Sequence, residues 1–259
     1  MARENVRLEV EEGIGVATFS RPAVLNALDA RTLEELDEVV GEVERGEARA
    51  LVLTGAGDRA FVAGADVGAL AGMSPEEARR FAERGHAVLD RLERLSVPTV
   101  AAVNGYALGG GCEVALACDL IYASEKARFG QPEVNLGIVP GFGGTQRLPR
   151  RVGPMRALEI LLTGDPVDAG RALELGLVLE VLAPEKLLGH VRAQVKKILS
   201  RGPLAVAQVK RLVRAGAGLP LGPANELERQ GFAALFATAD AGEGIRAFLE
   251  KRPPRFRGA

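Results

Sequence analysis

The most informative segment of this chain is VNGYALGGGCEVALACDLIYA, residues 103–123. It continues a short apolar strand expected at 98–103, turns at Asn104-Gly105, and places Gly109-Gly110-Gly111 before a helical stretch at 112–118. A second apolar strand is expected at 120–123. This order of strand, glycine-rich turn, helix and strand predicts an α/β fold.

The flanking segments continue the alternation of strands and helices. A β-hairpin is expected over 6–20, a helix over 29–47 and a buried strand over 50–54. Ser74-Pro75-Glu76-Glu77 is typical of a helix start, because serine caps the helix, proline suits its first position and glutamate its third. From residue 143 the helical period dominates, over 155–162, 169–175, 185–199, 204–214 and 226–237, with one strand expected at 178–182. We therefore expect an α/β core followed by a helical C-terminal portion.

Composition and charge limit the classes of function. The chain has 259 residues, 47% hydrophobic and 26% charged, as in an ordinary globular protein. Its net charge of −1 offers no broad attraction to phosphate backbones, which argues against nucleic acid as the main partner. The charged start at 1–13 and the lack of an apolar run of about 18 residues predict neither a signal peptide nor a membrane span. We expect a cytoplasmic protein whose two cysteines, Cys112 and Cys118, are reduced.

Other motifs point away from common enzyme classes. Gly55-Ala-Gly-Asp-Arg-Ala60 matches the loose dinucleotide pattern, but the chain after it is expected to be extended rather than helical. The only histidines, His86 and His190, leave no HExxH zinc pair and little room for a Ser-His-Asp triad. Among these enzyme classes, acid–base catalysis by residues other than histidine therefore remains.

Glu113 follows the three glycines directly, in the first turn of the expected helix. On one interpretation the glycines only form a tight turn, and the carboxylate complements the helix dipole by about 0.3–1 kcal/mol. On the other, the glycines let a ligand approach the backbone, whose free N–H groups stabilise negative charge. The small residues of Phe61-Val-Ala-Gly-Ala-Asp66 offer a second backbone donor. Paired donors of this kind form an oxyanion hole for a thioester enolate.

A second carboxylate, Glu133, stands 20 residues after Glu113, within Phe129-Gly-Gln-Pro-Glu133. Hydration of a double bond needs one group to take a proton from water and another to protonate the α-carbon. Two carboxylates suffice for this without metal or cofactor, and crowding and burial raise the pKa of one of them. The spacing alone does not establish that the two side chains converge.

Taken together, these segments resemble the enoyl-CoA hydratase, or crotonase, family. The similarity extends over nearly the whole chain and is carried in order by RPAVLNAL at 21–28, FVAGAD at 61–66, VNGYALGGGCEVALACDLIYA at 103–123, FGQPEVNLGIVPGFGGTQRLPRRVG at 129–153 and GIRAFLEKRPPRF at 244–256. The resemblance implies a crotonase-like spiral of repeated ββα units over 1–195 as the catalytic core. A helical region over 196–259 would take part in oligomerisation, as trimers or hexamers, and cover the CoA site.

By the same resemblance, Glu113 corresponds to the catalytic base for water and Glu133 to the acid at the α-carbon. The backbone N–H groups of Ala65 and Gly110 correspond to the oxyanion hole. Coenzyme A enters as part of the substrate, so neither a separate cofactor nor a metal is implied. The residues expected to bind the substrate or its CoA are Ala63, Asp66, Val67, Gly68, Phe142 and Lys251.

The presence of both glutamates favours reversible hydration of trans-2-enoyl-CoA to 3-hydroxyacyl-CoA, in fatty acid β-oxidation or related acyl-CoA metabolism. Two alternatives stay open: another CoA-ester enzyme of the family, an isomerase or hydrolase, and a non-catalytic RNA-binding or scaffolding member. Phe142 stands where many members carry a smaller residue, which predicts a narrowed acyl pocket. The basic tail beginning at Lys251 is either a solvated end or a contact for CoA phosphates.

Overall fold

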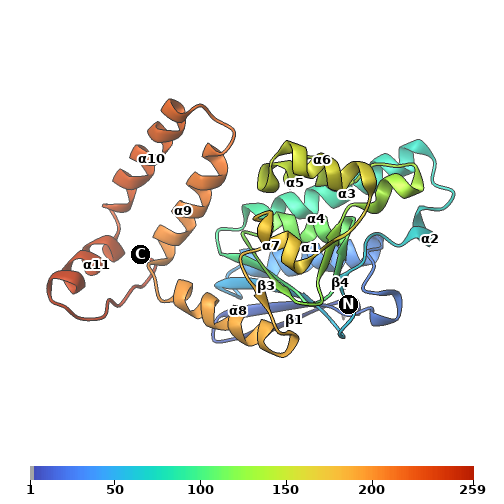
Figure 1. Cartoon of the computed structure of the whole chain (residues 1–259). Coiled ribbons are helices and arrows are strands. Elements are labelled where there is room, and N and C mark those ends of the chain that lie inside the picture. Colours follow the sequence, from blue (N-terminus) through green and yellow to red (C-terminus); the bar gives the residue numbers. More distant parts are fainter. Residues whose placement is uncertain (1–2) are drawn as a thin grey trace. The chain divides into compact units, whose positions relative to one another are not determined.

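The computed structural model describes residues 3–259, which form two compact units. The first contains Thr99–Val191 and the described residues up to Leu95, and the second contains Ser96–Pro98 and Arg192–Ala259. All strands among the described residues belong to the first unit, whereas the secondary structure of the second is helical (Figure 1). Helix α8 (Pro184–Leu199) runs from one unit into the other.

Three consecutive ββα repeats build the first unit. Each repeat gives its first strand to a six-stranded sheet and its second strand to a four-stranded sheet, and then ends in a helix. The repeats are β3 (Ala50–Gly55), β4 (Ala60–Val62) and α3 (Pro75–Arg94); β5 (Thr99–Val103), β6 (Tyr106–Leu108) and α4 (Gly110–Ala117); and β7 (Leu120–Ser124), β8 (Arg128–Gly130) and α5 (Gly144–Val152). This arrangement confirms the expected crotonase-like spiral.

The hairpin of β1 (Val6–Glu11) and β2 (Ile14–Phe19) starts the larger sheet, whose order is β1-β2-β3-β5-β7-β10 and in which only β1 and β2 pair antiparallel. The smaller sheet has the order β4-β6-β8-β9. The other elements of the first unit are η1 (Pro22–Val24), α1 (Ala30–Glu44), α2 (Val67–Leu70), η2 (Pro132–Leu136), α6 (Pro154–Thr163), β9 (Val167–Asp168), α7 (Ala169–Glu174) and β10 (Val181–Leu182). The second unit contains the end of α8, then α9 (Pro203–Gly216), α10 (Leu221–Leu235) and α11 (Ala239–Leu249).

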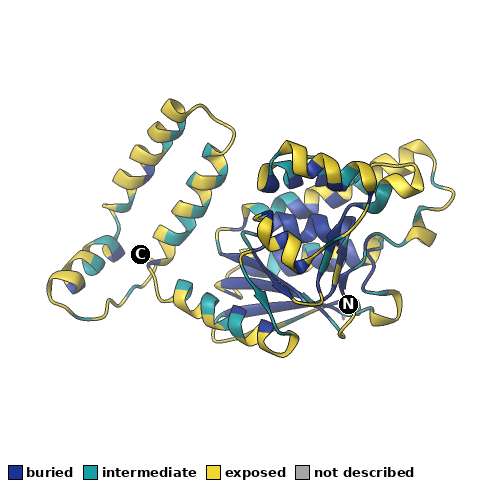
Figure 2. Cartoon of the chain, in the orientation of Figure 1, coloured by how far each residue is buried: buried dark blue, intermediate teal, exposed yellow. Residues whose placement is uncertain are grey.

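Burial follows from this layering. Parallel strands covered on both faces consist of continuous apolar runs, and all five residues of β5 are buried. Helix α4 is buried around its whole circumference, since each of its eight residues is buried (Figure 2). The most buried helix of the first unit therefore carries the glycine-rich turn and Glu113.

Several elements differ from the sequence-based expectations. The strand expected at 178–182 is reduced to Val181–Leu182, and α4 begins two residues earlier than expected, at Gly110. Helices α5 and α11 and the three-residue strands β4, β6 and β8 were not predicted. The three strands span too few residues to show a period. The chain enters β4 at Ala60 rather than a helix, which confirms the extended conformation expected after Gly55.

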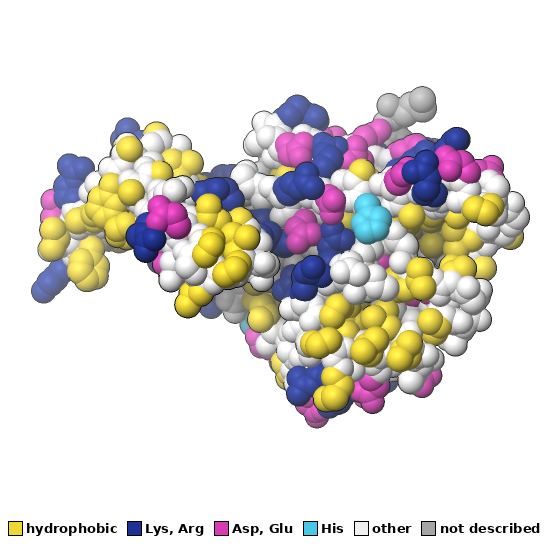
Figure 3. All heavy atoms as spheres, turned by 90° about the horizontal axis from the view of Figure 1, so that it is seen from above, with side chains coloured by type: hydrophobic (Ala, Val, Ile, Leu, Met, Phe, Trp, Pro, Cys, Tyr) yellow, Lys and Arg dark blue, Asp and Glu magenta, His cyan; other side chains and the backbone are white. Residues whose placement is uncertain are grey.

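Surface charge agrees with the composition. On the face drawn in Figure 3, Lys and Arg side chains alternate with Asp and Glu side chains and with hydrophobic ones. Over residues 3–259, no helix is both long enough and apolar enough to cross a membrane.

Candidate active site

The start of α4 forms the centre of the candidate site. Strand β6 ends at Leu108, Gly109 adopts φ 48° and ψ −123°, and the helix begins at Gly110. The positive φ favours glycine at position 109. A side chain at Gly111 would have its Cβ 1.9 Å from the Val62 carbonyl oxygen, so the helix start packs directly on β4. In the described part of the chain no side chain caps this helix, which leaves backbone N–H groups available to a ligand.

Glu113 lies in the first turn of α4 and is only 1% exposed. Its Oε1 accepts hydrogen bonds from the backbone N–H groups of Phe142, at 2.8 Å, and Gly144, at 2.7 Å. Burial raises the pKa of Glu113 to about 7 against the opposing effect of these donors, and the negative charge of Glu133 adds to the rise. A group that is still partly protonated near neutral pH suits general acid–base chemistry.

Glu133 approaches the same place from η2. A Cβ on Gly109 would lie 2.5 Å from Glu133 Oε1, so this carboxylate lies against the residue that precedes the helix. Burial raises the pKa of Glu133, and its buried Oε2 has no hydrogen-bond partner within residues 3–259. The Glu113 N–H donates to the carbonyl oxygen of Gly109 at 3.0 Å, so the two glutamates meet at the same residue before α4.

Ala65 lies beside the same turn. In its parallel bridge with Leu28, the Leu28 N–H donates to Gly64 O and the Asp66 N–H donates to Leu28 O, each at 2.8 Å. In such a pattern the N–H of the residue between, Ala65, points away from Leu28. A Cβ on Gly64 would lie 3.5 Å from the Leu108 carbonyl oxygen, which places this chain beside the end of β6. Neither the Ala65 nor the Gly110 N–H donates to an acceptor in the described chain.

The other expected substrate contacts fall into two groups. Ala63 donates its N–H to Leu25 O at 3.1 Å, and Asp66 caps α2 by accepting from the Gly68 N–H at 3.1 Å. Val67 and Gly68 are exposed at the start of α2, so these four residues surround Ala65 in the sequence and in space. Lys251, by contrast, is an exposed residue of the second unit just after α11, with φ 55°.

Phe142 is buried between two helices. A Cβ on Gly85 of α3 would lie 2.1 Å from its ring, and one on Gly110 of α4 would lie 3.3 Å from it. The ring centroid is 5.2 Å from that of Phe81. The Phe142 ring thus packs beside the candidate oxyanion donor Gly110.

Sequence reasoning missed two residues of this region. Gln131 is fully buried, and both polar atoms of its side chain lack a hydrogen-bond partner among the described residues. Arg147, on the unpredicted helix α5, donates to the Phe142 carbonyl oxygen at 2.7 Å. A polar residue just after the apolar strand at 129–130 was the available signal for Gln131, whereas no pattern marked Arg147.

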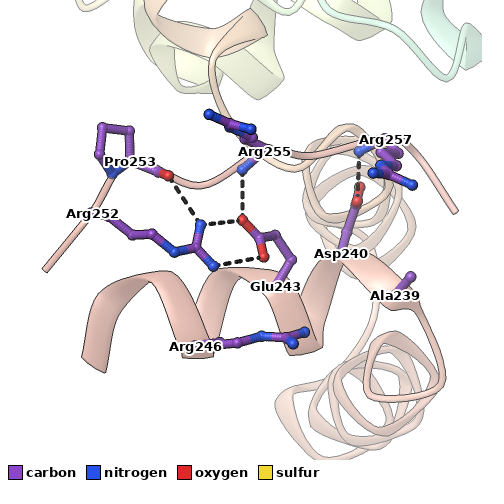
Figure 4. A pocket seen from close by; sticks show the side chains of 8 residues that line it. All are labelled: Ala239, Asp240, Glu243, Arg246, Arg252, Pro253, Arg255 and Arg257. Carbon is purple, nitrogen blue, oxygen red and sulfur yellow. Dashed lines mark hydrogen bonds and ion pairs between the residues drawn. The ribbon is translucent and has the colours of Figure 1, made fainter. Parts of the chain in front are cut away.

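The basic tail follows α11 in the second unit. Arg252 binds both oxygens of Glu243, at 2.6 and 3.0 Å, and lowers the pKa of Glu243 to about 2. Asp240 accepts from the N–H groups of Arg257 and Gly258, at 2.7 and 2.8 Å. The residues that make these contacts line an open pocket of about 660 Å³ (Figure 4). The tail is therefore bound to α11 rather than being a freely solvated end.

The ββα spiral defines a protein of the crotonase fold, and two candidate acid–base carboxylates meet at the start of α4. Comparison with known proteins agrees: the family model described as enoyl-CoA hydratase/isomerase matches residues 9–259. The chain belongs to this enoyl-CoA hydratase/isomerase family.

Relatives in the family include a crotonyl-CoA hydratase of Syntrophomonas wolfei, 47% identical with 99% of each chain covered. A short-chain-enoyl-CoA hydratase of Clostridium acetobutylicum is 46% identical with 97% of each chain covered. Among solved structures, an enoyl-CoA hydratase of Bacillus anthracis superposes with a TM-score of 0.95 at 37% identity, covering 99% of this chain and 100% of the other.

Proposed function

We propose that this chain catalyses the reversible hydration of trans-2-enoyl-CoA to 3-hydroxyacyl-CoA. The observation that carries the proposal is the meeting of the buried carboxylate of Glu113 and the half-buried carboxylate of Glu133 at an uncapped helix start. Relatives named crotonyl-CoA hydratase and short-chain-enoyl-CoA hydratase, at 47% and 46% identity, support it. The substrate is an acyl-CoA thioester, and the scheme needs no cofactor beyond the CoA of that substrate.

In the proposed reaction the thioester oxygen accepts hydrogen bonds from the N–H groups of Ala65 and Gly110. These donors draw electron density from the double bond, and water adds to the β-carbon while Glu113 takes one of its protons. The negative charge that develops on the thioester oxygen is stabilised by the same two donors. Glu133 then gives its proton to the α-carbon, and the reverse sequence eliminates water. Hydration leaves Glu113 protonated and Glu133 ionised, so proton exchange with solvent after product release restores the starting state.

The hydrogen bonding around the two carboxylates supports this division of roles. Two N–H groups hold Glu113 Oε1, which favours the ionised form and leaves Oε2 to receive a proton. Glu133 Oε2 has no such partner in the described chain, so a proton there is not shared with another protein group.

The decisive experiment incubates the purified chain with crotonyl-CoA and follows the products by mass spectrometry. Formation of 3-hydroxybutyryl-CoA supports hydration. In a parallel incubation with a 3-enoyl-CoA, formation of the 2-enoyl isomer, separated by liquid chromatography, would instead identify the isomerase alternative. Release of free CoA would identify the hydrolase alternative. Absence of turnover together with RNA binding would identify the non-catalytic alternative.

The rate of hydration should depend on pH near neutrality. Because the raised pKa of Glu113 is about 7 and the base must be ionised, kcat/KM should fall as pH decreases through about 7. An ordinary exposed glutamate would begin to lose activity only near pH 4 to 5. Initial rates measured between pH 5 and 9 check this, and a profile that stays flat down to pH 5 would contradict it.

Replacing Phe142 by alanine should change the preference for acyl chain length. Its ring packs against Gly110, so its removal opens space beside the candidate oxyanion donor. We expect kcat/KM for a ten-carbon enoyl-CoA, relative to the four-carbon substrate, to rise about 10-fold, because pockets discriminate by 1–3 kcal/mol per methylene. The ratio itself corrects for any general loss of activity, and an unchanged ratio would exclude this role.

We also propose that the protein is a cytoplasmic homo-oligomer, a trimer or a hexamer, in which Lys251 contacts CoA phosphates. Exposed aromatic side chains on the helices of the second unit support self-association, because Phe232, Phe236 and Phe248 are 65%, 60% and 82% exposed. Light scattering of the purified protein tests the assembly, and a monomer at micromolar concentration would refute it.

A further inference from the structure

One residue connects the buried carboxylate of Glu113 to a cation outside the candidate site. The N–H of Phe142 donates to Glu113 Oε1 at 2.8 Å, while its carbonyl oxygen accepts from Arg147 Nη1 at 2.7 Å. The second donor to Glu113, the Gly144 N–H, lies two residues later at the start of α5. The turn 142–144 is therefore bonded to Glu113 on one side and to Arg147 on the other.

Arg147 is in turn fixed to a different helix. Its Nη2 binds Asp90 Oδ1 at 2.7 Å and its Nε binds Glu93 Oε2 at 2.9 Å, both on α3. The side chain is only 12% exposed, and its backbone N–H donates to Gly143 O at 2.8 Å. A partly buried guanidinium with three separate acceptors is rigidly oriented, unlike a surface ion pair.

We infer that Arg147 is a positioning residue for hydration: it ties the turn 142–144 to α3 and thereby holds the Glu113 carboxylate in the orientation that receives a proton from water. Arg147 can have this role only if the chain is the hydratase proposed above. Its guanidinium binds the Phe142 carbonyl oxygen, Asp90 and Glu93, so its positioning effect passes through the two N–H groups on Glu113.

The charge of Arg147 also favours the ionised form of Glu113. The groups that influence Glu113 are Glu133 from η2, which raises its pKa, and Arg147 from α5, which lowers it. Cys112 precedes Glu113 on α4 and is buried and uncharged at neutral pH, since burial raises the pKa of its thiol. On α3, the acids Asp90 and Glu93 bind Arg147, and His86 lies beside Gly143. Loss of the Arg147 charge should therefore raise the pKa of Glu113.

The test compares Arg147→Met with Arg147→Lys and with Arg150→Met, which removes an exposed arginine from the same helix. For Arg147→Met we expect kcat for crotonyl-CoA to fall about 10- to 100-fold with KM little changed, since small misplacements of a reacting group cost this much. The decrease of kcat/KM at low pH should also move to higher pH. The lysine variant should keep the wild-type pH profile and recover part of kcat, because it keeps the charge but not the forked contacts.

Asp90→Asn is the second variant, because it weakens the attachment to α3 while keeping Arg147 itself. It should lower kcat less than Arg147→Met, with circular dichroism showing a folded protein. If the wild type hydrates crotonyl-CoA but Arg147→Met, folded, matches Arg150→Met in kcat and pH profile, the positioning role is wrong. If the wild type has no hydratase activity, it is the proposed function that fails.

Discussion

Replacing Glu113 by glutamine is expected to lower kcat for crotonyl-CoA hydration about 10²- to 10⁴-fold, the usual contribution of a general base. The amide has the shape of the carboxylate, and its oxygen can still accept the N–H groups of Phe142 and Gly144. It cannot take a proton from water. KM should change little, because in the proposed reaction the thioester oxygen is held by backbone groups. Steady-state kinetics on the purified variant measures both constants.

Glu35 of α1 provides a matched control. It is also a buried glutamate, 5% exposed, and accepts backbone N–H groups from residues 4–6. Burial acts to raise its pKa, but these N–H donors outweigh burial, and the pKa of Glu35 is lowered. Glu35→Gln should therefore lower the melting temperature and leave kcat unchanged. If Glu113→Gln retained wild-type kcat, or if Glu35→Gln reduced kcat as strongly, Glu113 would not be the base.

The pH dependence of folding stability should further distinguish Glu113 from Glu35. Because the folded-state pKa of Glu113 is raised to about 7 from an ordinary 4.5, its contribution to stability is present below pH 4.5 and is lost as pH rises through about 7. Glutamine has no such loss, so Glu113→Gln should be at least as stable as the wild type at pH 8. Active sites often contain a residue whose ionisation opposes folding.

Much of the fold could be predicted from the sequence because its signals are local. The helix at 75–94 begins with the capping box that Ser74 and Glu77 form, and the buried strand at 50–55 is a continuous apolar run. The strands β4, β6 and β8 could not be predicted, because three residues show no period and their pairing depends on segments far apart in the sequence. Their place in the spiral followed only from the resemblance to the family.

The sequence indicated the candidate acid–base residues of the site but not the residues that hold them in place. The residue types at 113 and 133 showed that two acids were available, whereas their convergence required the packing of η2 against the turn before α4. Arg147 carries no sequence signal of its own, because its effect depends on α3 acids that lie more than 50 residues earlier. Local patterns thus indicate candidate reacting groups, whereas tertiary contacts show which residues surround them.

Gly109→Ala is expected to lower kcat for hydration about 10²-fold, because the new methyl group would displace the second carboxylate. The added Cβ would lie 2.5 Å from Glu133 Oε1, so the carboxylate must move away from the start of α4. The backbone at φ 48° and ψ −123° adds strain of about 1–3 kcal/mol for any residue other than glycine. Steady-state rates measure the effect of displacing Glu133, and the melting temperature measures the effect of the backbone strain.

Gly176→Ala isolates the contribution of strain. Gly176 also has a positive φ, 72°, but a Cβ there meets no atom within 4 Å in the described chain. This control should lose stability and keep kcat, whereas Gly109→Ala should lose both. Glu133→Asp in the Gly109→Ala background shortens the displaced side chain by one methylene and should recover part of the lost rate if crowding is the cause. Wild-type kcat in a folded Gly109→Ala protein would mean that Glu133 does not act from beside this glycine.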